Sequence, residues 1–200
     1  MSIGNKLAAV FLLIMAWIGI YMALFHGIGE QGRTSGAAAA AKKSWDLHSA
    51  CGITLQAPGS FSPFEHNFGE AAKLMESGES RRCMFPDFLE IVTRVTFRQG
   101  AQINLDNTVK GHLASLSAMH GVTVQSTATK RDSVSGRLAR RVDATLTQGS
   151  GWFNKHSILM SALWIMDERT MYCVQVDAEN ADTQVLADME KVMKSVKIGR

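Results

Sequence analysis

The 200-residue sequence is poor in several residue types, with only three prolines, three cysteines and two tyrosines. With so few prolines, 8% aromatic and 46% hydrophobic residues, the composition excludes a disordered or low-complexity chain. No C-x-x-C motif is present, which argues against a thioredoxin-like redox site. The glycine-rich phosphate motifs and the G-x-S-x-G nucleophile motif are also missing, and the histidines lack zinc-site spacing. We therefore expect no metal, cofactor or catalytic residue, with an enzyme of unrecognised site as an alternative.

Neither sign of charge is in large excess. Lys and Arg number 21 against 18 Asp and Glu, which gives a formal net charge of +3. This charge is too small to indicate a nucleic-acid partner, and basic residues do not alternate with aromatic ones. The mean hydropathy of +0.00 is high for a soluble domain, and the apolar surplus lies in one N-terminal block.

Residues 7–28 contain no charged residue and no proline. As a helix, this segment spans roughly 33 Å, about the thickness of the bilayer hydrocarbon core. It therefore predicts a transmembrane helix between a short tail, residues 1–6, and a flexible linker, residues 29–44. A cleaved signal peptide is the alternative, although its apolar region is typically only about 7–15 residues long. Because a long domain translocates largely regardless of its charge, we expect a single-pass protein of the inner (plasma) membrane with an extracytoplasmic, periplasmic C-terminal domain.

Residues 45–200 show the pattern of one soluble α+β domain. The apolar run 156–166 is expected near the centre of a sheet and in a hairpin with 171–177. In another strand Ile91, Thr93, Val95 and Phe97 share one face, because side chains alternate. The order of segments predicts a mostly antiparallel sheet flanked by helices. Strands are expected at 52–57, 79–85, 89–98, 122–130, 137–147, 156–166 and 171–177, and helices after Asn104 or Asp106 and after Asn180 or Asp182.

Four segments carry a resemblance to a known family: 52–61, 119–124, 135–145 and the apolar hairpin from 158 to 178. In order and pattern they resemble the PsbP/DcrB-like domains over about residues 50–198. The resemblance implies an α/β/α sandwich that acts as a binding or accessory module. It brings no shared catalytic residues. The chain departs from many of these domains because an apolar segment stands where they have a lipid-modified cysteine.

Two of the three cysteines, Cys51 and Cys83, flank the first and second expected strands. If those strands are neighbours, a disulfide between them is geometrically feasible and would suit an oxidising compartment. Two unrelated thiols are the alternative. Cys173 lies in an apolar strand and is expected to be a buried free thiol.

The densest basic cluster lies around one expected hairpin. Arg137 and Arg141 have the same strand parity, whereas Arg140 points to the opposite face. Such a cluster could contact an acidic partner or anionic headgroups. A solvated sheet edge, where positive charges discourage edge pairing, is the alternative. The members of the cluster are Lys130, Arg131, Arg137, Arg140 and Arg141.

Trp152 and Phe153 follow a Gly-Ser-Gly turn in an expected loop. Exposed aromatic residues there would form a contact site for a partner or a membrane, and folding back onto the core is the alternative. The sequence thus predicts a membrane-anchored extracytoplasmic binding or assembly module of a cell-envelope complex. Its partners would be the membrane, through residues 7–28, and another protein. A cleaved, secreted periplasmic ligand-binding domain is the second hypothesis.

Overall fold

The computed structural model describes residues 44–65, 68–85, 88–119, 121–148, 156–179 and 182–199. The predicted membrane helix, nearly all of the linker, and Trp152 with Phe153 lie outside these residues. No helix in the described part of the chain is long and apolar enough to cross a bilayer. The elements are β1 (Asp46–Ala50), β2 (Ile53–Ala57), β3 (Ser62–Pro63), η1 (Gly69–Leu74), β4 (Met75–Met84), β5 (Phe88–Phe97), α2 (Leu105–Ala118), β6 (Val122–Val134), β7 (Arg137–Gln148), β8 (His156–Asp167), β9 (Thr170–Ala178), α3 (Thr183–Ser195) and β10 (Lys197–Ile198).

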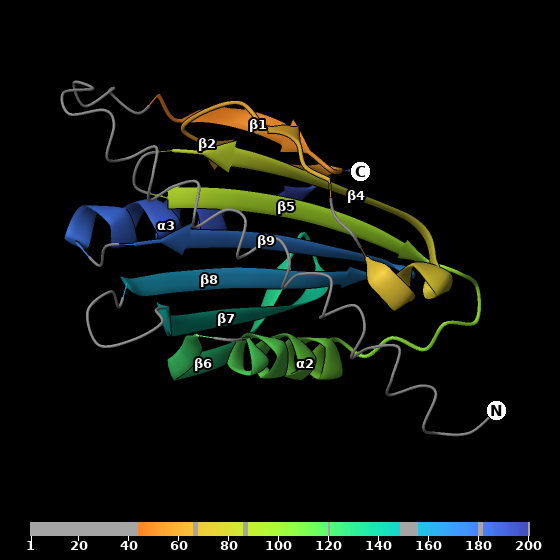
Figure 1. Ribbon diagram of the computed structural model, residues 1–200. Helices are drawn as coiled ribbons and strands as arrows, with labels where there is room; N and C mark the ends of the chain where they lie inside the picture. Colours follow the sequence, from red (N-terminus) through yellow and green to blue (C-terminus); the bar gives the residue numbers. More distant parts are fainter. Residues whose placement is uncertain are drawn as a thin grey trace.

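A seven-stranded antiparallel sheet forms the centre of the described part, in the order β3-β4-β5-β9-β8-β7-β6 (Figure 1). The apolar strand β8 is interior and forms a hairpin with β9, as the sequence predicts. Strand β6 forms one edge. The prediction of an α+β fold with a mostly antiparallel sheet is therefore confirmed.

Helix α2 covers one face of the sheet, over β6, β7 and β8. It begins at the N-cap Asn104, whose side chain accepts a hydrogen bond from the Asn107 amide, as expected of a cap residue. The predicted shared face of β5 points toward this side. The buried residues of this layer include Ile91, Val95, Phe97, Val109, Leu116, Val142, Leu146, Ile158 and Trp164.

The opposite face is covered by α3 together with a second, three-stranded sheet in the order β1-β2-β10. Helix α3 begins at the N-cap Asp182 and buries the apolar stripe that its sequence predicts. The Ser195 hydroxyl at its end accepts a hydrogen bond from the Gln56 amide of β2. In Figure 1 the β1–β2 pair lies beside β4 and β5, and α3 follows the end of β9. The sequence did not predict β1, β3 or β10, because each is short or lacks clear alternation.

Candidate functional site

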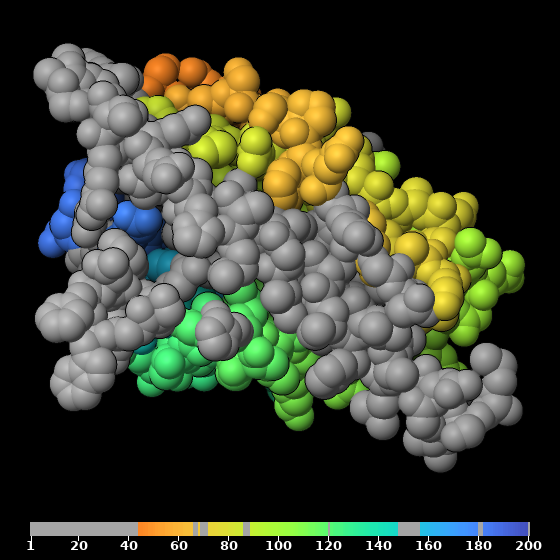
Figure 2. Space-filling model, viewed as in Figure 1, coloured from red at the N-terminus to blue at the C-terminus, as the bar shows by residue number. Residues whose placement is uncertain are grey.

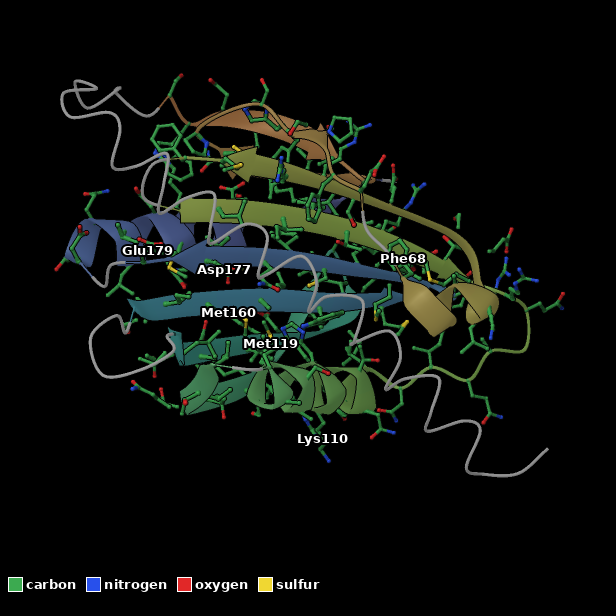
Figure 3. The ribbon with its side chains drawn as sticks, viewed as in Figure 1. Phe68, Lys110, Met119, Met160, Asp177 and Glu179 are labelled. Atoms are coloured by element: carbon green, nitrogen blue, oxygen red, sulfur yellow. The ribbon has the colours of Figure 1, made fainter. Side chains whose placement is uncertain are left out.

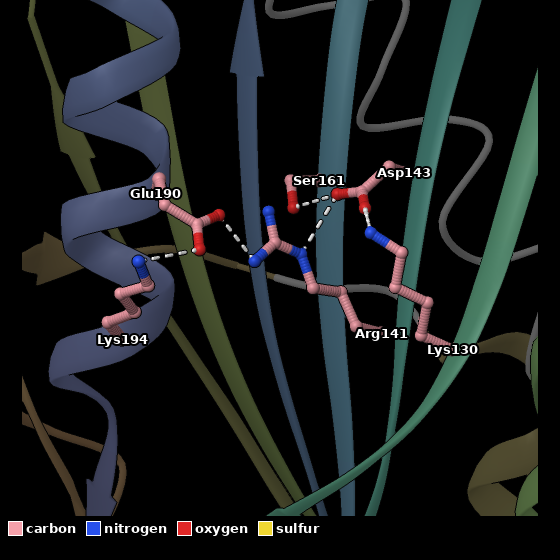
Figure 4. A network of polar contacts seen from close by, with 6 residues as sticks. All are labelled: Lys130, Arg141, Asp143, Ser161, Glu190 and Lys194. Atoms are coloured by element: carbon pink, nitrogen blue, oxygen red, sulfur yellow. Dashed lines mark hydrogen bonds and ion pairs between the residues drawn. The ribbon is translucent and has the colours of Figure 1, made fainter.

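Arg141 of β7 organises a charged network on the α3 side of the sheet (Figure 4). Its Nε lies 3.0 Å from Asp143 Oδ1 and its Nη1 lies 2.5 Å from Glu190 Oε2. Burial lowers the pKa of Arg141, but the hydrogen bonds that it donates to both carboxylates outweigh this effect, so the net shift is upward. Burial raises the pKa of Glu190, but its hydrogen bonds with Arg141 and Lys194 outweigh this effect, so the net shift is downward. Arg141 therefore connects α3 to the sheet as a permanently charged group.

Three further side chains extend this network. The Ser161 hydroxyl of β8 donates to Asp143 Oδ1 at 2.7 Å. Lys130 Nζ on the edge strand lies 3.9 Å from Asp143 Oδ2, and Lys194 Nζ lies 3.3 Å from Glu190 Oε1. The contacts thus connect β7 to β6, β8 and α3. They hold these elements together and do not indicate a reaction.

Arg140 points to the opposite face, as its strand parity predicts. Its guanidinium is nearly buried and binds both carboxyl oxygens of Asp106, at 2.6 and 3.3 Å. The hydrogen bond from Arg140 lowers the pKa of Asp106. Because Asp106 lies in the first turn of α2, this pair fastens the start of the helix to the sheet.

The structure divides the predicted basic cluster into two groups. Arg137, Arg140 and Arg141 are compensated within the chain, Arg137 by Asp167 at 2.8 Å. Lys130 and Arg131 instead lie exposed on the edge strand β6. The five residues therefore do not form one continuous contact surface, and Trp152 and Phe153 lie outside the described residues.

A buried acid–amide pair in β9 faces the α2 side of the sheet. Gln175 Nε2 donates to Asp177 Oδ2 at 2.7 Å, and both side chains are almost fully buried. Burial raises the pKa of Asp177 to about 7, against the opposing effect of the Gln175 bond. Met160 of β8 is directly opposite Asp177, and Figure 3 shows the two on the sheet with Met119 nearby. Figure 2 shows α2 (green) and the η1 region (yellow) at separate places on the visible face.

A further buried carboxylate of the sheet, Glu90 of β5, lies on the α3 side. It is 0% exposed, and neither carboxyl oxygen has a hydrogen-bond partner among the described residues. Burial raises its pKa to about 8. Neither acid is among the site residues predicted from the sequence, because their strands are recognised by their apolar residues. A single acid within a β-branched strand was the available signal in each case.

The predicted disulfide between Cys51 and Cys83 is not formed, since all three cysteines are free and buried. The Cys51 thiol lies 3.4 Å from the carbonyl of Val92 and 3.8 Å from that of Glu79. Cys83 is four residues beyond Glu79 along β4, roughly 13 Å in an extended strand. Cys83 instead pairs with Glu90 across β4 and β5. Burial raises the pKa of both thiols to about 11.

No group of three or more His, Cys, Asp and Glu side chains in the described part could hold a metal ion. The arginines of β7 are paired with acids, and the buried acids Glu90 and Asp177 are closed to solvent. The fold and these sites define a small α+β domain, an antiparallel sheet covered on both faces.

No protein-family model matches the sequence, and no curated protein matches it either. Solved structures are similar in fold. Cyanobacterial PsbP from Synechocystis sp. is 11% identical, with a TM-score of 0.47 over 84% of this chain and 99% of that one. A Pseudomonas aeruginosa protein of unknown function is 11% identical, with a TM-score of 0.42 over 78% and 97%. The Saccharomyces cerevisiae Ran-binding protein Mog1p is 12% identical, with a TM-score of 0.39 over 78% and 96%.

These neighbours share only a general course of the chain with this protein, because every TM-score is below 0.5. Nothing about its function follows from them. A PsbP is among them, in line with the PsbP part of the predicted resemblance, and the resemblance to DcrB-like domains stays a prediction.

Proposed function

We propose that this protein is a membrane-anchored binding or accessory module of a cell-envelope complex, and that its α+β domain lies outside the cytoplasm. The observation that carries the proposal is the uncharged, proline-free run of residues 7–28, which is long enough for one membrane crossing. The domain that follows would be held close to the membrane by the short linker 29–44.

The described chemistry supports binding rather than catalysis. The two carboxylates with strongly raised pKa values, Glu90 and Asp177, are 0% and 2% exposed. A general acid or base must come within hydrogen-bond reach of its substrate, which such burial prevents. Arg140 and Arg141 are occupied in fastening α2 and α3 to the sheet. The surface is therefore the part of this domain available to a partner.

Membrane anchoring is tested with the full chain expressed in bacterial cells, followed by fractionation, an alkaline wash and intact mass. We expect the complete chain, including residues 7–28, to stay in the washed membrane pellet. The variant Ile18→Arg should reduce this retention, because an arginine at the centre of the segment costs roughly 2.5–3.5 kcal/mol on insertion scales, and Ile18→Leu should not. A soluble chain lacking residues 1–28 would instead indicate a cleaved, secreted domain, and a soluble complete chain would refute both readings.

The side of the membrane is tested by labelling intact cells with a membrane-impermeant maleimide small enough to enter the periplasm. The three native thiols are buried, so the wild-type protein is its own control. Lys110 lies exposed on α2, and Figure 3 shows it pointing away from the sheet. We expect Lys110→Cys to be labelled in intact cells. Labelling only after lysis would place the domain in the cytoplasm and refute this part of the proposal.

A further inference from the structure

Strand β6 is an open edge of the large sheet. It pairs with β7 on one side and, among the described residues, with no strand on the other. Nine consecutive residues, 125–133, are exposed on both faces of the strand. Positions 125–129 contain neither proline nor a charged residue, and the charged residues that commonly protect an open edge are confined to positions 130–132.

The hairpin turn determines which backbone groups of β6 point outward. Ser135 and Gly136 have φ values of 50° and 79°, as in a two-residue type I′ turn. Such a turn is closed by a hydrogen bond between the residues that flank it, here Val134 and Arg137. Because hydrogen-bonded and non-bonded pairs alternate, the amides and carbonyls of residues 127, 129 and 131 point away from β7. At Ser133 the outward amide is already bound by Asp132 Oδ1 at 2.7 Å.

Like charges face each other across β6 and β7 in two successive rows. Lys130 is opposite Arg141 on one face, and Arg131 is opposite Arg140 on the other. Such pairs are unfavourable unless acids compensate them. The acids present bind the β7 arginines closely, whereas Lys130 reaches Asp143 only at 3.9 Å.

Arg131 is exposed, and Asp106, whose pKa it helps to lower, is bound at two points by Arg140. The edge strand therefore carries one exposed basic side chain on each face, at two adjacent positions, and the exposed acid Asp132 follows them.

We infer that β6 accepts an extended segment of a partner protein as an added strand, and that this segment carries two consecutive acidic residues. Adjacent residues of a strand point to opposite faces, so one acid would lie beside Lys130 and the next beside Arg131. The main chain of the segment would bind the outward groups of residues 127–131, in the manner of other strand-addition complexes. This inference names the partner class of the binding module proposed above. It depends on β6, whereas the anchoring test depends on residues 7–28, so either can fail alone.

The charge requirement is tested with the full-length protein in detergent and a fluorescent peptide of sequence Thr-Val-Thr-Glu-Glu-Thr-Val-Thr, by anisotropy. We expect saturable binding that weakens about tenfold or more in the variant Lys130→Glu/Arg131→Glu, because attraction becomes repulsion in both rows. The matched peptide with Lys-Lys in place of Glu-Glu should show the reverse preference. Absence of binding by either peptide, or equal binding of both, would overturn the inference.

The backbone requirement is tested by N-methylating the acidic peptide on alternate residues, in two complementary sets, which leaves its charges unchanged. Only one set of amides faces β6, so one set should abolish binding and the other should not. If both peptides bind as tightly as the parent, the contact is purely electrostatic and strand addition is refuted. Anionic phosphatidylserine vesicles that compete fully with the peptide would indicate a headgroup site instead. Concentration-dependent dimers that exclude the peptide would indicate β6 pairing with a second copy.

Discussion

At the scale of single residues, the two buried acids occupy the same end of the sheet on opposite faces. Glu90 is opposite Val176, and the preceding Leu89 is opposite Asp177. Glu90 lacks any hydrogen-bond partner in the described part of the chain, whereas Asp177 has Gln175. Burial alone therefore accounts for the upward shift of the Glu90 pKa.

Glu90 should make the protein less stable as the pH rises. Its pKa is about 8 when folded and 4.5 in the reference state. Between these values the unfolded chain has released the proton and the folded chain keeps it, so the free energy of unfolding falls with rising pH. The total decrease in the free energy of unfolding is on the order of a few kcal/mol. In Glu90→Gln this part of the pH dependence should disappear, as measured by denaturant unfolding from about pH 5 to about pH 8.

The control is Glu168→Gln, which alters an exposed carboxylate in the turn between β8 and β9. Its pH dependence should match that of the wild type. An unchanged pH dependence in Glu90→Gln would show that Glu90 gains a partner or solvent in solution. The comparison also separates Glu90 from Asp177, which titrates in all three proteins.

At the scale of elements, both α-helices of the described residues begin at residues that the sequence itself marks. Asn104 and Asp182 each accept a hydrogen bond from the backbone amide three residues later. These caps are local, so the sequence was sufficient to predict them. The connection of α3 to Arg141 is different, because Arg141 and Glu190 are 49 residues apart and no local pattern pairs them.

Removing the cap of α2 should destabilise the domain by about 1 kcal/mol. Asn104→Ala leaves the Asn107 amide without its side-chain acceptor. Asn104→Asp should retain the stability, because the carboxylate accepts the same bond and suits the positive end of the helix. The measurement is the midpoint of urea unfolding at a constant m-value. The control Asn107→Ala removes an exposed side chain and should stay within about 0.5 kcal/mol of the wild type.

At the scale of the whole molecule, the described fold is two cores on the two faces of one sheet. The α2 core and the α3 core share β5, β7, β8 and β9. The three-stranded sheet closes the α3 core by pairing β10 with β2, and the Gly199 amide donates to the Gly52 carbonyl at 3.2 Å. Cys173 lies within the α2 core and Cys51 within the α3 core, and Cys83 is buried as well.

The thiols should therefore report global unfolding. In the native protein we expect all three to react slowly with a disulfide reagent, because burial raises their pKa values and restricts access. Under denaturing, non-reducing conditions three thiols per chain should react. In Cys83→Ala the count should fall to two. A single reactive thiol in the denatured wild type would mean that Cys51 and Cys83 are bridged in the purified protein.

The sequence by itself determined most of the described elements. Alternation and helical spacing are local properties, so the strands of the large sheet other than β3, the helices α2 and α3, their caps and the β8–β9 hairpin could be predicted. The same patterns classified Ile91 and Val95 correctly as core residues. These patterns did not predict whether the other face of β5, which carries Glu90, is buried or exposed.

Only the tertiary structure decided that environment. Glu90 is buried because β2, β10 and α3 come from distant parts of the chain to cover the α3 side of the sheet. The separation of Cys51 from Cys83 and the division of the basic cluster depend on the same long-range pairings. Register between distant segments follows from how whole faces pack together, and no window of neighbouring residues contains that information. The exposed edge of β6 is likewise a property of the assembled sheet, although the residues that make it basic were visible from the start.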